Sequence, residues 1–274
     1  MTHTTIDHYM KLQGNVVLIS GASSGMGTAL AKNFAKEHCK LVLCARREDK
    51  LKELADILKK ETDCIYKTCD VKNKSDIDEA VRFAYKSFGR IDVAILAAGI
   101  LVPNPIEVFD SSIIKDSMET NFLGDVYFIE SLLPIMKKQK SGVIAAISTL
   151  PDKRGVPGWG AYGASKAAVS WMMESLRSEA KQKYNIDIIT IKPGSVKTPM
   201  IEGFYRPGAI SAEQAADYIT RGIKQGKKII QFPLSQVLMI RMQDQFPVVV
   251  YDNIPIELQK GKGYPTAKEK ELRE

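Results

Sequence analysis

The sequence predicts an α/β fold, in which a doubly wound parallel sheet of about seven strands carries helices on both faces. Two observations lead to this prediction. Short apolar runs rich in β-branched residues alternate with helical stripes across residues 14–232, and the runs are nearly continuous, which is typical of strands buried on both faces. No internal repeat or Pro/Gly linker interrupts this alternation. We therefore expect right-handed crossovers between parallel strands.

The expected strands are, in order, Val16–Ser20, Lys40–Ala45, Cys64–Cys69, Val93–Ala97, Val143–Ser148, Ile186–Lys192 and Ile229–Phe232. Between them lie stripes of apolar residues spaced by three or four, which would put one face of a helix on the core. The clearest stripes are Leu51, Leu54 and Leu58; Ile77, Val81, Ala84 and Phe88; and Met118, Phe122, Val126, Ile129 and Leu133.

Length and composition agree with one globular domain. The 274 residues are 45% hydrophobic and 26% charged, which excludes a disordered, collagen-like or fibrous chain. We expect a single domain over residues 1–274, with a core at 14–232, an apolar extension at 233–260 and a charged, flexible tail at 261–274.

The sequence also predicts a cytoplasmic location. It has neither a signal peptide nor a run of about 18 apolar residues. Its four cysteines, Cys39, Cys44, Cys64 and Cys69, are then expected to be reduced, buried thiols and not metal ligands. The net charge of +7 would suit nucleic acid, an acidic membrane or an anionic cofactor. No nucleic-acid module is present, so we expect neither a nucleic-acid partner nor a metal.

A glycine-rich turn, Gly21-Ala22-Ser23-Ser24-Gly25-Met26-Gly27, joins the first strand to the first helix. Glycines at this spacing permit a tight turn and let a pyrophosphate approach the free amides at the start of a helix, where the helix dipole is positive. In this strand–turn–helix context the turn favours a dinucleotide site over a merely structural turn.

The same turn matches the Gly-x-Ser-x-Gly elbow of serine hydrolases, with Ser23 as the nucleophile. That chemistry needs a histidine late in the chain. The histidines are His3, His8 and His38, and none follows an acidic partner downstream, so the hydrolase interpretation is excluded.

The end of the second strand indicates which dinucleotide binds. An acid about 20 residues beyond the glycines would bind the ribose 2′-hydroxyl of NAD. Here Arg46 and Arg47 occupy this place, and guanidinium groups match a phosphate bidentately. We therefore expect NADP(H) in preference to NAD(H), with a solvated basic patch as the alternative.

Tyr162 and Lys166 are one helical turn apart and share a helix face. An ammonium near a phenol would lower the phenol pKa from about 10 towards neutrality. Such a phenol can act as a general acid to a carbonyl oxygen or as a general base to an alcohol. Pairs of this kind are also common on exposed helices, so by itself the pair leaves both interpretations open.

Taken in order, these motifs resemble the short-chain dehydrogenase/reductase family, over residues 14–232, in its subtype with a YxxxK motif. The matching segments are SGASSGMG at 20–27, Asp70-Val71, AAG at 97–99, Asn121 with Gly124, Ser148-Thr149, YGASK at 162–166 and KPGSVKTPM at 192–200. The resemblance implies a Rossmann-type fold and hydride transfer between a nicotinamide and a carbonyl/alcohol pair.

The resemblance also implies a role for each matching residue. Tyr162 would be the acid/base, Lys166 would tune it and bind the nicotinamide ribose, and Asn121 would distort its helix and hold a relay water. The hydroxyl of Thr149 would donate to the substrate oxygen. The implied cofactor-binding residues are Gly21, Ser23, Ser24, Gly25, Met26, Gly27, Arg46, Arg47, Asp70, Val71, Ala98, Gly99, Pro193, Gly194, Val196 and Thr198.

Three positions depart from the family pattern. Thr149 stands where serine is usual, and the preceding Ser148 should point to the opposite face of its strand. The segment Leu96–Gly99 lacks both asparagines of the usual NNAG, and Ser20 replaces a threonine. These departures motivate an alternative from another class, a catalytically weakened NADP(H)-binding regulatory or scaffold protein.

Two loops at the carboxyl ends of strands are expected to wall the substrate pocket, Pro151–Trp159 and Met200–Ile210. Both are apolar and aromatic, which indicates a hydrophobic ketone or aldehyde. In the second loop, Phe204 and Tyr205 are followed by Arg206, which would be solvated or meet an anionic group of the substrate.

Partner contacts are expected at two places. The resemblance implies a homodimer or homotetramer through helices at 111–138 and 159–184, with Trp171 and Met173 facing a partner. The apolar segment at 234–254 would pack on the substrate loop, form a subunit contact, or lie on a membrane surface as a peripheral contact.

Overall fold

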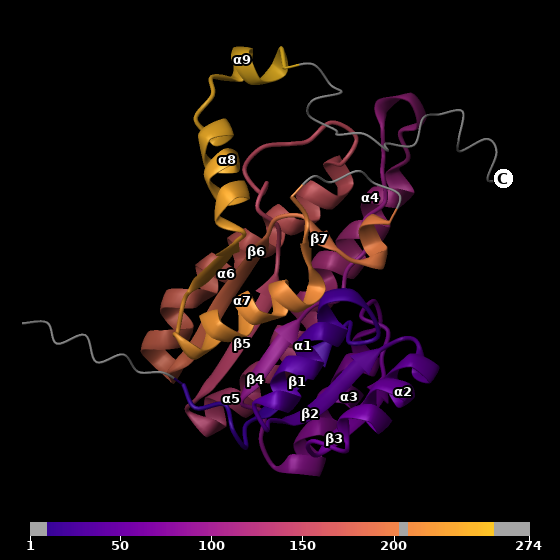
Figure 1. Ribbon diagram of the computed structural model, residues 1–274, viewed down its shortest axis with the longest axis vertical. Coiled ribbons are helices and arrows are strands. Elements are labelled where there is room, and N and C mark those ends of the chain that lie inside the picture. The colour runs from indigo at the N-terminus through magenta and orange to yellow at the C-terminus, as the bar shows by residue number, and fades with distance from the viewer. Residues whose placement is uncertain (1–9, 203–207, 255–274) are drawn as a thin grey trace, which may run out of the picture.

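The computed structural model describes residues 10–202 and 208–254 and confirms the doubly wound α/β fold (Figure 1). Within these residues one seven-stranded sheet, parallel throughout, has the order β3-β2-β1-β4-β5-β6-β9. Its strands are β1 (Val16–Ser20), β2 (Lys40–Ala45), β3 (Cys64–Thr68), β4 (Val93–Leu96), β5 (Gly142–Ile147), β6 (Ile186–Pro193) and β9 (Ile229–Phe232). Two short strands, β7 (Val196–Lys197) and β8 (Ile210–Ser211), pair separately.

Helices cover both faces of the sheet because successive side chains of each buried strand point to opposite faces. One face carries α1 (Gly25–Lys36), α2 (Glu48–Leu58) and α7 (Ala212–Lys224), and the other carries α3 (Lys74–Phe88), α5 (Gly124–Gln139) and α6 (Gly160–Tyr184). The remaining helical segments are α4 (Ser111–Met118), α8 (Leu234–Asp244), α9 (Val248–Asp252), a π-helical turn at Glu119–Leu123 and 3₁₀ turns at Ile106–Val108 and Pro199–Ile201.

The chain reverses its direction of travel across the sheet next to β1. It passes from β1 outward to β2 and β3, and then returns to β4 on the other side of β1. Such a switch point opens a crevice at the carboxyl ends of the strands. There the hydroxyl of Ser20 accepts hydrogen bonds from the backbone N–H groups of Ala97 and Ala98, at 3.1 and 3.3 Å.

The predicted strands are confirmed, with ends that differ by one residue. Cys69, Ala97 and Ser148 lie just beyond their strands, β5 begins at Gly142 and β6 extends to Pro193. The sequence does not predict β7 and β8, because a two-residue strand is too short to show a period.

The predicted stripe from Met118 to Leu133 is confirmed for three of its five members, because Ile129 is buried and the half-buried Phe122 and Leu133 pack against the core, while Met118 and Val126 are half-buried without a core contact of this kind. The fully buried face is formed by Asn121, Asp125, Phe128, Leu132 and Met136. A π turn adds a residue to one turn and so rotates the face that follows it. The π turn at Glu119–Leu123 therefore turns part of the apolar stripe away from the sheet, leaving it half-buried.

The expectation for Met173 is also wrong. Its side chain is fully buried in the core beneath α6, on the helix face that packs against the sheet, so it does not face a partner. Trp171, two residues earlier, points outward and is 79% exposed.

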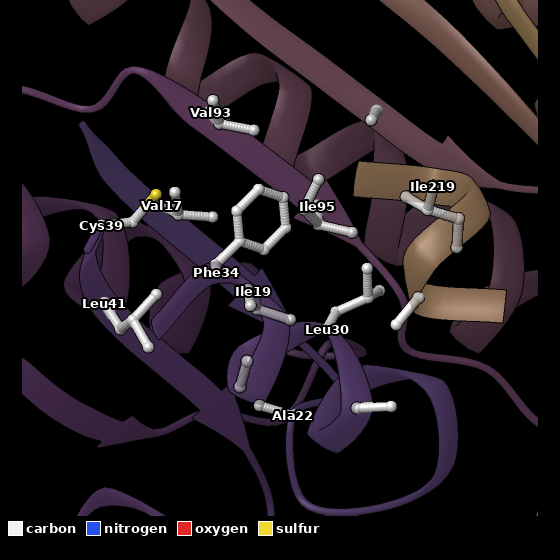
Figure 2. Close-up of a cluster of buried hydrophobic side chains, with 14 of the residues drawn as sticks. Val17, Ile19, Ala22, Leu30, Phe34, Cys39, Leu41, Val93, Ile95 and Ile219 are labelled. Carbon is white, nitrogen blue, oxygen red and sulfur yellow. The ribbon is translucent and has the colours of Figure 1, made fainter. Parts of the chain in front are cut away.

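The core between the sheet and α1 is built around Phe34. Figure 2 shows its ring among Val17, Ile19 and Ile95, with Leu30 one turn away on the same helix. All of these side chains are fully buried. Because α1 carries the glycine turn at its start, this contact fixes the turn against the sheet.

We expect Phe34→Ala to lower the free energy of unfolding by about 3–5 kcal/mol, because it removes a buried ring and leaves a cavity. Chemical denaturation measures the change. Phe109→Ala, at a ring that is 64% exposed, serves as the control and should change stability by less than about 0.5 kcal/mol. Equal effects of the two substitutions would contradict this description of the core.

Candidate active site

At its glycine positions, the turn between β1 and α1 leaves little room for a side chain. Gly21 and Gly25 have φ angles of +66° and +54°, in the left-handed region that glycine favours. A Cβ on Gly27 would overlap the carbonyl oxygen of Gly21, and a Cβ on Gly21 would lie 2.7 Å from the Cα of Ala98. At these two positions the turn therefore packs directly on itself and on the segment that follows β4.

The start of α1 is open to an anion. Ser24 occupies the N-cap position but its side chain makes no capping hydrogen bond, so the first-turn amides of Gly25, Met26 and Gly27 are not covered by a side chain. Free amides and the positive end of the helix dipole attract phosphate. Together with the close-packed glycines, these amides fit the pyrophosphate of a dinucleotide.

A guanidinium group lies beside the same turn. Arg47 donates from Nη2 to the Ser23 hydroxyl at 3.0 Å and to the Ser23 carbonyl at 3.3 Å. Arg46 is exposed at the adjacent position. The structure therefore brings one of the two predicted arginines into direct contact with the glycine turn.

Asn121 sits in the π turn and links three segments. Its carboxamide oxygen accepts from the N–H of Ile100 at 2.7 Å, and its amide nitrogen donates to the Ile100 carbonyl at 2.9 Å and to the Ser165 hydroxyl at 3.0 Å. A helix distortion at Asn121 was expected from the family resemblance, and the π turn is that distortion. The amide thereby holds the segment after β4 against α5 and α6.

Tyr162 and Lys166 lie in the first two turns of α6, as predicted. The Lys166 ammonium donates to the Ile147 carbonyl, at the end of β5, at 2.7 Å. It also faces Gly99, where a Cβ would lie 3.5 Å from Nζ and 3.2 Å from the carboxamide oxygen of Asn121. The structure therefore gathers Gly99, Asn121 and Lys166 at one point.

The two hydroxyls that follow β5 have different surroundings. Ser148 is fully buried, donates to the Lys166 carbonyl at 2.8 Å and contacts the Ser170 hydroxyl at 2.7 Å. Thr149 lies near enough to Tyr162 for its hydroxyl to lower the pKa of the phenol. Thr149 is thus beside the phenol, while Ser148 lies beneath α6.

The direction of the Tyr162 pKa differs from the expected one. Burial raises the pKa of the phenol above its usual value, and the hydrogen bond with Thr149 opposes this only in part. The reason is geometric: the Lys166 ammonium is directed at the Ile147 carbonyl, so it does not stabilise a phenolate here. The phenol is therefore protonated at neutral pH.

One charged residue of this region was missed by the sequence reasoning. Asp125, one turn after Asn121 on α5, is 2% exposed and interacts electrostatically with Lys166. A carboxylate at the i+4 position from Asn121, on the helix face that continues through Phe128 and Leu132, was the signal that could have revealed it.

The remaining predicted cofactor residues lie around the crevice. Thr198 packs on the glycine turn, where a Cβ on Gly25 would come within 3.1 Å of its methyl group. Pro193 ends β6, Gly194 follows it, and Val196 is buried in β7. Asp70 and Val71 follow β3, and Val71 packs closely on Gly124, at the start of α5.

The loop after β5 is tied to the C-terminal helices. Asp152 pairs with Lys192 at 2.5 Å, and Arg154 donates to the carbonyls of Asp244 and Phe246, at the end of α8. Gln236 of α8 accepts from Ser195 N–H at 2.8 Å. The apolar C-terminal segment therefore packs on the loop expected to wall the substrate pocket, which was one of its three predicted contacts.

Several apolar side chains of that segment are nevertheless exposed to solvent in the single chain. They include Leu234, Leu238, Met242, Val248 and Val249. No helix in the part of the chain that the structure describes is both long and apolar enough to cross a bilayer. The predicted pocket residues Phe204, Tyr205 and Arg206, and the tail at 261–274, lie outside the described residues.

The cysteines are unpaired and buried, as predicted. Burial raises the pKa of the Cys39, Cys64 and Cys69 thiols to about 12 and raises that of Cys44 as well. Thiols of this kind are protonated at neutral pH and chemically inert, so they act as small core side chains.

Comparison with known proteins agrees with this geometry. Residues 15–206 match the family model described as short chain dehydrogenase. An uncharacterized oxidoreductase of Listeria monocytogenes is 35% identical over 195 residues, which cover 70% of this chain and 79% of the relative.

Two solved structures share the fold. A short-chain dehydrogenase/reductase of Burkholderia phymatum in complex with NAD superposes with a TM-score of 0.80 at 21% identity, covering 94% of this chain and 99% of that protein. A short-chain dehydrogenase of Burkholderia cenocepacia in complex with NADP has a TM-score of 0.79 at 20% identity, covering 90% and 100%.

We expect Gly27→Ala to weaken dinucleotide binding at least about tenfold, because the added methyl group would displace the Gly21 carbonyl from the turn. Fluorescence titration with NADPH and NADH measures the affinity. Gly160→Ala is the control, since a Cβ at Gly160 meets nothing within 4 Å. Unchanged binding by the Gly27 variant would exclude the turn as the cofactor cradle.

Proposed function

Since the chain belongs to the short-chain dehydrogenase/reductase family, we propose that it is an NADPH-dependent oxidoreductase that reduces a hydrophobic ketone or aldehyde to an alcohol. One observation carries this proposal. Lys166, which shares a face of α6 with Tyr162, converges with Asn121 on Gly99, at the same edge of the sheet as the glycine turn. The chain's family and its parallel sheet support hydride chemistry at this edge.

Tyr162 is proposed to donate the proton in the reductive direction. A general acid must carry its proton before the reaction, and a phenol, with an ordinary pKa of about 10, carries it at neutral pH. Thr149 donates to the carbonyl oxygen of the substrate as negative charge develops there. Both groups act on one oxygen atom, so the substrate carbonyl is held between them.

Lys166 and Asn121 are proposed to support this pair. The buried ammonium of Lys166, anchored on the Ile147 carbonyl, faces Gly99 and would bind the hydroxyls of the nicotinamide ribose. Asn121 holds the segment after β4 in place through its bonds to Ile100 and would position a relay water. When bound, NADPH supplies the hydride from C4 of its nicotinamide.

The cofactor preference is proposed from the contact between Arg47 and Ser23. A guanidinium held beside the glycine turn, with Arg46 next to it, favours a 2′-phosphate because the fork of N–H donors matches phosphate oxygens. The proposed cofactor contacts in the rest of the crevice are Asp70 and Val71 at the adenine, Ala98 and Gly99 beyond β4, and Pro193, Gly194, Val196 and Thr198 beside the nicotinamide.

We also propose that the enzyme works in the cytoplasm as a homodimer or homotetramer. The unpaired cysteines support a reducing compartment. Exposed Trp171 on α6 and half-buried Val126 on α5 support subunit contacts through these helices.

A second candidate is a weakened NADP(H)-binding regulatory or scaffold protein. It is motivated by threonine in place of serine at 149 and by the alanines at 97 and 98. The test is turnover: tight cofactor binding with no oxidation or reduction across a panel of ketones, aldehydes and alcohols would favour this candidate.

Tyr162→Phe should lower kcat for carbonyl reduction at least about a hundredfold, because it removes the proton donor and keeps the ring. Loss of NADPH absorbance measures the rate. Tyr184→Phe, at the far end of α6, is the matched control and should stay within twofold of the wild type. Full turnover by the Tyr162 variant would rule out the proposed acid.

Arg47→Asp should reduce the preference for NADPH over NADH at least about tenfold, since one charge-assisted contact to phosphate is lost and a carboxylate is added beside the ribose. The ratio of kcat/KM values for the two cofactors measures it. Arg46→Asp, made in parallel, tells which arginine contributes more. Lys52→Asp, on the exposed face of α2, controls for the change in net charge, and a shift of equal size there would contradict the assignment.

A further inference from the structure

Gln236, on α8, is a polar side chain to which the proposed mechanism gives no role. Its carboxamide oxygen accepts a hydrogen bond from the Ser195 N–H at 2.8 Å, and its amide nitrogen donates to the Gly208 carbonyl at 2.9 Å. A side-chain amide carries both a donor and an acceptor, so it can bind two backbone segments at once. Gln236 therefore joins two segments that are well separated in the sequence.

The two bonded groups lie at the start of the short ladder between β7 and β8. The strands of this ladder are parallel and two residues long. The Ser195 carbonyl accepts from the Ile210 N–H at 3.1 Å, while its N–H donates to Gln236. An isolated two-stranded ladder is marginally stable, so the two hydrogen bonds of the amide reinforce it from outside.

Gly194, which precedes Ser195, is packed against the same amide. A Cβ at Gly194 would overlap Oε1 of Gln236 and lie 3.2 Å from Cδ1 of Leu150. The Gly194 N–H donates to the Phe232 carbonyl, at the end of β9, at 2.8 Å. The backbone here is therefore held between the segment after β5, the end of β9, and α8, which contributes Gln236.

The helix that carries Gln236 is itself anchored to the sheet. It continues directly from the end of β9 (Figure 1). Val237 is buried, and its N–H donates to the Pro233 carbonyl at 3.0 Å, which closes the first turn of α8. Gln236 therefore extends from a fixed element and can hold other segments in place.

The segment that Gln236 holds leads to the glycine turn. It runs from the end of β6 through the buried Val196 to Thr198. A Cβ on Gly25 would come within 3.1 Å of the Thr198 methyl group. The proposed function places the nicotinamide beside this segment. A shift at Ser195 would therefore move one wall of the crevice relative to the glycine turn.

We propose that Gln236 is a positioning residue, which fixes the segment Pro193–Thr198 for the nicotinamide half of the cofactor. It does so by holding the Ser195 N–H and the Gly208 carbonyl. The proposal deepens the proposed function and rests on it for the cofactor. The adenine half is assigned to the glycine turn and Arg47, beyond β1 and β2, whereas Gln236 acts beyond β6 and β9. Loss of Gln236 should therefore weaken the nicotinamide contacts and spare the adenine contacts.

Titrations with the whole cofactor and with its adenine half separate these effects. Gln236→Met keeps the length of the side chain and removes both hydrogen bonds, so the Kd for NADPH should rise at least about tenfold. The Kd for adenosine 2′,5′-bisphosphate, which lacks the nicotinamide half, should stay within about twofold. If NADH binds more tightly than NADPH, NADH and adenosine 5′-monophosphate form the matching pair. Gln243→Met, half-buried on the same helix, is the matched control and should change neither Kd more than about twofold.

A second measurement tests the hydrogen bonds without any cofactor. Amide hydrogen exchange followed by NMR should show the Ser195 N–H exchanging at least about tenfold faster in Gln236→Met, because this N–H loses its acceptor. The Gly194 N–H, which is bonded to the Phe232 carbonyl, should keep its rate and so reports on the surrounding fold. In Gln236→Glu the Ser195 N–H keeps an acceptor and should remain protected.

Three results would overturn the proposal: an unchanged Ser195 exchange rate in Gln236→Met, an unchanged Kd for NADPH, or equal weakening of NADPH and the bisphosphate. If Gln236→Met fails to fold, Gln236→Glu takes its place in the titrations, because it loses the donor to Gly208. The Kd for NADPH should then rise at least about threefold, and no rise would overturn the proposal.

Failure of the proposed function gives a different result. A wild-type protein that binds NADPH but reduces no carbonyl would remove the reductase activity and leave the role of Gln236 in cofactor binding standing. A wild-type protein that binds neither NADPH nor NADH would overturn both, whatever the exchange rate of Ser195.

Discussion

The side-chain amide of Asn121 is the contact on which the rest of the candidate site depends. It joins the segment after β4, the π turn before α5 and the start of α6 through three hydrogen bonds. The site needs groups from three elements that are far apart in sequence, and the amide has enough donors and acceptors to bind all of them at once. The π turn is required because it rotates this residue to the buried face.

The glycine turn depends on a different constraint, which is that no side chain can be accommodated at Gly21 and Gly27. Its backbone lies so close to the end of β4 that a Cβ at Gly21 would touch Ala98. A larger residue at Gly21 would push the turn away from the end of β4. The fully buried Phe34, on the same helix, holds the turn against the sheet, so packing stability and ligand binding rely on a single helix.

Two ionisable side chains are buried in this region. Asp125 and Lys166 are both almost completely inaccessible, and burial disfavours the charged form of each. The contacts that anchor α8 and α9 to the loop after β5 work differently, because Arg154 binds backbone carbonyls.

The sequence by itself determined the order of strands and helices, the glycine turn and the helix that carries Tyr162 and Lys166, because these follow from local periodicity and spacing. It failed for part of the face of α5, where one π turn changed the phase, and for Met173, since a helix pattern does not say which side meets the sheet. Only the tertiary structure decided that Lys166 reaches the Ile147 carbonyl and that burial raises the pKa of Tyr162. Charges and solvent access depend on distances between segments that the chain brings together only when it folds.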